Sequence, residues 1–121
     1  MPANDARALT GDGVDLLLVG SPTQMFGRRL LVRSFLDGLK ARDFAGVAAA
    51  AFDTRMGTPT QKNAAEAEVI AARLQAAGCR LVTPPESFLV VGFTGPLAPG
   101  EEERAKGWAL GVAERLAVVT A

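Results

Sequence analysis

Short apolar runs alternate along the chain with longer segments whose apolar residues have helical spacing. The first run, residues 14–20 (Val-Asp-Leu-Leu-Leu-Val-Gly), has turn signals at both ends, which is typical of a strand buried on both faces. Ser21, Pro22 and Thr23 follow. They are expected to form a turn, because proline cannot donate the hydrogen bond that a central strand requires.

The next segment, residues 28–40, is predicted to be a helix. Gly38 is expected to weaken its last turn, since glycine is a poor helix former. Its apolar residues recur at i, i+3, i+4 and i+7 and would share one buried face. They are Val32, Phe35, Leu36 and Leu39.

A second strand is predicted over residues 45–52 (Ala-Gly-Val-Ala-Ala-Ala-Ala-Phe). Alanine has a poor strand propensity, so the four alanines alone are also compatible with a helix. The run is short and ends in Asp53, Thr54 and Arg55, followed by a Gly-Thr-Pro loop. These features favour a strand that ends at residue 52.

The second helix is predicted over residues 63–77, with Gly78 as its left-handed C-terminal cap. Glu66 is expected to face water. The buried stripe would consist of Ala67, Ile70, Ala71 and Leu74.

The last strand and helix complete the pattern. A strand over residues 80–91 is expected to be interrupted at Pro84 and Pro85. A helix over residues 101–118 starts with three glutamates, which suit the positive end of the helix dipole. Trp108 lies on its apolar face and is expected to be core.

This order, β-α-β-α-β-α with short connections, predicts an α/β fold with a parallel sheet and right-handed crossovers. The prediction is one domain over residues 1–121, with a leader at 1–12 and the folded body at 13–121. About three strands would form the middle of three layers, with helices on both faces.

Composition excludes several kinds of mechanism. The chain has no histidine and no tyrosine, and Cys79 is its only cysteine. Histidine-based catalysis is therefore excluded, and a metal site is not expected. The formal net charge is zero, with the basic residues scattered, so nucleic acid is not an expected partner. No apolar run approaches the ~20 residues of a membrane span. Without a signal-peptide core after Met1, a cytoplasmic location is expected.

Three segments together resemble the flavodoxin-like family, in the family's order and spacing, and cover nearly the whole chain from residue 12. They are residues 15–23 (DLLLVGSPT), residues 51–55 (AFDTR), and residues 84–88 (PPESF) with 95–97 (GPL). The resemblance implies a parallel sheet of which this chain matches only the third strand onward. The family's first two strands, its first helix and its phosphate-binding loop have no counterpart.

The resemblance implies FMN as cofactor and electron transfer as activity. Carried over by position, the flavin-ring residues lie in two loops: Ser21, Pro22, Thr23, Gln24, Met25 and Phe26 in one, and Asp53, Thr54, Arg55, Met56 and Gly57 in the other. A substitute for the phosphate loop is not found. Residues 10–13 precede a strand instead of a helix, and residues 93–100 are followed by three glutamates that would repel a phosphate.

The candidate residues also have plainer interpretations. Asp53 ends a strand as a phosphate-accepting aspartate of a receiver domain does, but a role in capping local amides is favoured. Arg55 could pair with an anionic ligand or with Asp53, and the pair with Asp53 is favoured. Ser21 and Thr23 are expected to form a turn and not to act as catalytic groups. Cys79 is expected to be a buried, inert thiol. The two apolar loop residues 25–26 are equally consistent with folding back onto the core and with contacting a ligand or partner.

The favoured function is a non-catalytic interaction module that does not hold flavin tightly. The alternatives are an FMN-binding electron carrier whose missing half is supplied by another chain, acting with an unidentified redox partner, and a fragment of a longer protein. The strand that starts at Val14 and ends at Val19 would have one open, apolar edge, which is a template for pairing. A homodimer with one six-stranded sheet is therefore predicted.

Overall fold

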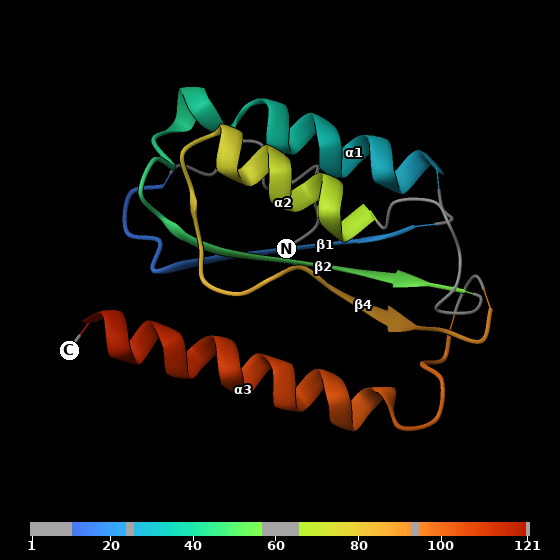
Figure 1. Cartoon of the computed structure of the whole chain (residues 1–121). Helices are drawn as coiled ribbons and strands as arrows, with labels where there is room; N and C mark the ends of the chain where they lie inside the picture. Colours follow the sequence, from blue (N-terminus) through green and yellow to red (C-terminus); the bar gives the residue numbers. More distant parts are fainter. Residues whose placement is uncertain (1–10, 24–25, 57–65, 93–94, 121) are drawn as a thin grey trace.

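The computed structural model describes residues 11–23, 26–56, 66–92 and 95–120 (Figure 1). The elements are β1 (Leu16–Pro22), α1 (Phe26–Asp37), a 3-10 turn η2 (Leu39–Arg42), β2 (Ala48–Arg55), α2 (Glu66–Ala76), β3 (Arg80–Leu81), β4 (Glu86–Leu89) and α3 (Glu101–Thr120). This order confirms the predicted α/β class. No helix in these ranges is long and apolar enough to span a membrane.

The sheet is parallel throughout, with β2 at its centre. β1 pairs with one side of β2, and both β3 and β4 pair with the other side. Ala48 at the start of β2 lies opposite Arg80, and Arg55 at its end lies opposite Leu89. β3 and β4 are therefore two pieces of one strand position, interrupted at the predicted prolines.

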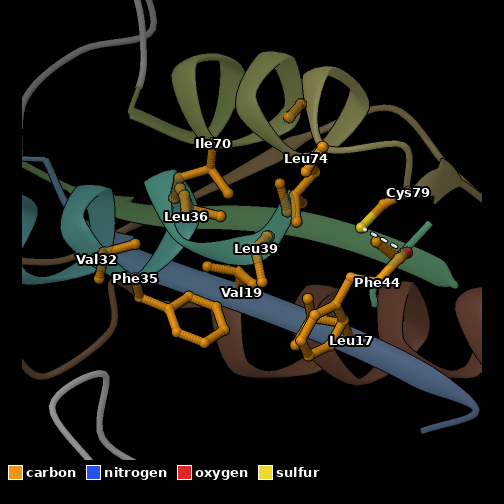
Figure 2. Close-up of a cluster of buried hydrophobic side chains, with 14 residues drawn as sticks. Leu17, Val19, Val32, Phe35, Leu36, Leu39, Phe44, Ile70, Leu74 and Cys79 are labelled. Carbon is orange, nitrogen blue, oxygen red and sulfur yellow. Dashed lines mark hydrogen bonds between the residues drawn. The ribbon is translucent and has the colours of Figure 1, made fainter. Parts of the chain in front are cut away.

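Helices α1 and α2 cover one face of this sheet, and α3 lies on the other (Figure 1). Successive side chains of a strand point to opposite faces. Leu17 and Val19 of β1 accordingly join the cluster under α1 and α2, with Val32, Phe35 and the other apolar helix residues around them (Figure 2). The predicted apolar residues of both helices are buried, and all except Ala67 belong to this cluster.

The alanines of β2 explain the close packing of these layers. All four, residues 48–51, are buried. A side chain of one methyl group lets the helix backbones approach the sheet closely, while Leu39, Phe44, Ile70 and Leu74 fill the remaining space around the strand. The low strand propensity of alanine is overridden because this strand is central and covered on both faces.

The α3 face contains a smaller aromatic cluster. Phe52, Phe88 and Trp108 pack edge to face, with ring centroids 5.7 to 6.3 Å apart. Trp108 therefore packs against the sheet, but it is only partly buried and not a full core residue as expected. Because α3 packs on β4, it leaves the other side of this face uncovered, and the Leu18 side chain of β1 is 46% exposed.

Pro22 is the first difference from the predicted elements. It lies inside β1, not in a turn, and is paired with Thr54. The proline is tolerated because its nitrogen points away from β2: Thr23 N–H donates to Thr54 O at 2.8 Å, and neighbouring residues of a strand point to opposite sides. The missing N–H thus falls on the sheet edge, where proline is accommodated.

Two further boundaries differ in the same region. Asp53, Thr54 and Arg55 belong to β2 and not to the loop after it. Phe26 opens α1, which ends at Asp37, so the predicted loop residue is helical and Gly38 stops the helix early. In both cases the pattern of apolar residues located the element but not its ends.

Glu66 is the clearest error in side-chain placement. It was expected to face water, yet it is 2% exposed. Its carboxylate accepts two hydrogen bonds from the guanidinium of Arg33, at 2.6 and 3.0 Å. The buried charge is therefore paired, and this fork of hydrogen bonds joins α1 to α2.

Candidate functional site

The carboxyl ends of β1 and β2 bring together the two segments that were expected to hold a flavin ring. Ser21 lies opposite Asp53, and Pro22 lies opposite Thr54. This edge of a parallel sheet is where open α/β folds bind ligands. Gln24, Met25 and Gly57 lie outside the described residues, and Phe26 is described only as the start of α1.

The polar groups at this edge bond mainly to one another. Asp53 is fully buried, and its Oδ2 accepts hydrogen bonds from the Thr23 hydroxyl at 2.5 Å and from Ala67 N–H at 3.2 Å. It therefore satisfies an amide in the first turn of α2, as a helix cap does. Asp53 Oδ1 has no hydrogen-bond partner in the described structure.

Asp53 therefore accepts a helix amide, but it does not cap local amides as expected: it lies in β2, and Ala67 is 14 residues away in sequence. None of the described ion pairs joins Asp53 to Arg55, as was expected. The Asp53 Oδ2 atom bonds to Thr23 and Ala67 instead. Ser21 is buried in β1, and its hydroxyl donates to the carbonyl of Pro22 at 3.3 Å.

The start of α3, the other strand-to-helix connection considered for a phosphate, is occupied by its own carboxylate. Glu101 Oε2 accepts a hydrogen bond from Leu89 N–H at 2.8 Å. Arg104 donates to Glu101 and Glu86, and also to the carbonyl of Ser87. The hydrogen bond from Arg104 and then the amide of Leu89 lower the pKa of Glu101. A negative charge is therefore held where a phosphate would have to bind.

Two other kinds of site find no support in the described ranges. The described residues contain no group of three side chains that could hold a metal ion. Cys79 is buried, with Sγ 3.6 Å from the carbonyl oxygen of Phe44 (Figure 2). Burial raises the pKa of its thiol, which disfavours the reactive thiolate.

The outer edge of β1 is a row of backbone donors and acceptors that has no strand partner in the described part of the chain. Thr23 N–H donates toward β2, and the backbone groups of successive strand residues point alternately toward β2 and away from it. The direction of every backbone group in β1 follows from this bond. The N–H and C=O groups of Leu17, Val19 and Ser21 point to β2. Those of Leu16, Leu18 and Gly20 point outward, where none of the described strands pairs with them.

Apolar side chains flank this edge on both faces of the sheet. Leu18 is on the α3 face. On the other face, residues of α1 follow one another at about 100°, so Arg33 and Leu31 lie on opposite flanks of the core-facing Val32. Arg33 contacts α2 through Glu66. Leu31 therefore lies on the flank of α1 that faces away from α2. Because α1 packs chiefly on β1 and α2 chiefly on β2, this flank lies beside the open edge of the sheet. The Leu31 side chain is 47% exposed.

The open edge itself was predicted from the sequence, but these two leucines were not. Residues 14–20 were interpreted as buried on both faces. The number of helices on each face of the sheet would have predicted their exposure. Two helices lie on one face and a single helix on the other, and one helix cannot cover three strand positions.

Comparisons with family models, with curated proteins and with solved structures found no match for this chain.

Proposed function

We propose that this chain is a non-catalytic interaction module with a truncated flavodoxin-like sheet, and that its activity is to pair through the outer edge of β1 with a second copy. The observation that carries the proposal is the row of outward N–H and C=O groups on Leu16, Leu18 and Gly20. An apolar edge of this kind is a template for strand pairing.

The charge of the chain suits self-association. Thirteen basic and thirteen acidic residues give a formal net charge of zero, so two copies do not repel each other strongly. The stretch of β1 from Leu16 to Pro22 contains no charged residue. Natural edge strands that avoid pairing commonly carry a charge or a proline. β1 carries no charge, and its one proline, Pro22, is its last residue.

Sedimentation equilibrium at micromolar concentrations tests the proposal. The expected mass is twice the 12.6 kDa of one chain. Leu18→Lys is expected to give the single-chain mass, because the lysine must be desolvated at the paired edge. Leu30→Lys is the matched control: Leu30 is 49% exposed, but on the solvent side of α1. A parent chain that sediments only as a monomer would contradict the proposal.

A second candidate is flavin binding, with the phosphate loop supplied by another chain. The observation that favours it is the hydrogen bond between Thr23 and Asp53, which holds together the two segments that resemble flavin-ring loops. Bound flavin would supply the redox chemistry, and residues at this edge would only orient its ring.

Titration of the purified chain with FMN and with riboflavin, followed by flavin fluorescence, tests this candidate. Equal and weak binding of both is expected, because the family's phosphate-binding loop has no counterpart in this chain and the first turns of α2 and α3 carry carboxylates. A strong preference for FMN would instead reveal a phosphate site within this chain. Absence of binding by either ligand would reject the candidate.

A further inference from the structure

The outward groups of β1 are arranged symmetrically about Leu18. Leu16 and Gly20 each lie two residues from it, and all three present both an N–H and a C=O to the open side. We propose that two copies pair as antiparallel strands across a two-fold axis at Leu18, with Leu18 opposite Leu18 and Leu16 opposite Gly20. This inference rests on the proposed function and specifies its register.

Backbone chemistry selects this register over its neighbours. If the second copy is shifted by two residues in one direction, Leu16 lies opposite Pro22, which has no N–H to donate. A shift in the other direction places Gly20 opposite Val14, whose N–H already donates to Gly11 O at 3.1 Å. With Leu18 at the axis, every outward N–H and C=O of Leu16, Leu18 and Gly20 has a partner.

The side chains on the α3 face agree with this pairing. The two exposed Leu18 side chains become direct cross-strand neighbours, an arrangement that stabilises antiparallel pairs. Leu16 of the second copy lies opposite Gly20, beside the Phe52 ring that packs across this glycine. The apolar surface that α3 leaves uncovered is thereby reduced in both copies.

The other face and the charges agree as well. Helix α1 returns antiparallel to β1, so Leu31 near its midpoint lies about level with the middle of the strand. The flank that carries Leu31 then faces the same flank of the second copy. Asp15, which directly precedes β1, lies opposite Ser21, which keeps the two Asp15 residues roughly 20 Å apart.

Cysteine cross-linking tests the register. In a Leu18→Cys variant the two Cα atoms would be about 5.5 Å apart, within the range for a disulfide. Leu16→Cys is the matched control, on the same strand, edge and face, but its two Cα atoms would be roughly 14 Å apart. The buried Cys79 thiol is not expected to react. Mild oxidation should cross-link Leu18→Cys several-fold more completely than Leu16→Cys.

The outcomes separate the register from the proposed function. Preferential cross-linking of Leu18→Cys supports the inference. If the parent has the dimer mass but Leu16→Cys cross-links as well as or better than Leu18→Cys, or neither cross-links, the register is overturned and the pairing module stands. If the parent is only a monomer in sedimentation, both fail. Circular dichroism of each variant confirms that the fold is retained.

Discussion

Gly20 shows how a single residue links β1 to the aromatic cluster on the α3 face. A Cβ at this position would lie 2.1 Å from Phe52 Cζ and 2.4 Å from both Cε atoms of the ring. The ring therefore packs directly across the glycine backbone. Any side chain there has to displace Phe52, which also contacts Phe88 and Trp108.

Gly20→Ala is expected to lower the free energy of unfolding by about 1–3 kcal/mol, because overpacking forces the Phe52 ring out of position. Urea denaturation followed by tryptophan fluorescence measures this change. Gly107→Ala is the control, since a Cβ at this exposed position of α3 meets nothing within 4 Å and alanine favours a helix. Equal stability of the parent and Gly20→Ala would contradict the packing described.

Pro22 and Glu66 mark the limit of residue-level prediction from the sequence. Proline was excluded from the strand because the strand was taken as paired on both sides, whereas its nitrogen falls on the open edge. Glu66 was placed in water by its helical position alone. Its partner, Arg33, is 33 residues away in sequence, and no local pattern indicates such a pair.

Among the elements, α3 is attached to the sheet in a way that depends on charge. Glu101 accepts the Leu89 amide of β4, and Arg104 bonds to both Glu101 and Glu86. Trp108 and Val112 add apolar contacts further along the helix. The first turn of α3 therefore holds the end of β4 through an ionised carboxylate.

Loss of the Glu101 charge is expected to destabilise this attachment in a pH-dependent manner. Its pKa in the folded chain is lowered from 4.5, so its contribution to stability is complete above that value and is lost as the pH falls through the folded-state pKa. Glu101→Gln should therefore be less stable than the parent near neutral pH, with a difference that shrinks in acid.

Unfolding free energies of the parent and Glu101→Gln, measured from neutral to acidic pH, check this expectation. Glu102→Gln serves as the control, because Glu102 is exposed and pairs only with Lys106, 3.7 Å away. A Glu101→Gln difference that stays constant with pH would contradict a role for the carboxylate charge.

At the level of elements, the sequence was informative about order and less so about extent. Apolar spacing located both buried helix faces, and the two prolines located the break between β3 and β4. It missed that Asp53 to Arg55 continue β2. Those residues pair with β1 and β4, and Asp53 is held by Thr23, just after β1, and by the start of α2. Only the folded chain creates these contacts.

On the scale of the whole molecule, the described sheet has three strand positions with β2 at the centre. β3 and β4 together occupy the position on one side of β2, and β1 occupies the position on the other side, where its outer edge has no partner among the described strands. The leucines beside that edge were not predictable from apolar periodicity, since a run such as residues 16–19 has the same pattern whether its outer face is covered or bare.

Amide hydrogen exchange of β1, resolved by residue and measured over a range of protein concentrations, tests the central claim most directly. The amides of Leu17 and Val19, which bond to β2, should be protected at every concentration. Those of Leu16, Leu18 and Gly20 should be protected increasingly as the concentration rises, because the second copy pairs with them. Fast exchange of these three amides at all concentrations, with Leu17 and Val19 protected, would contradict pairing through the β1 edge.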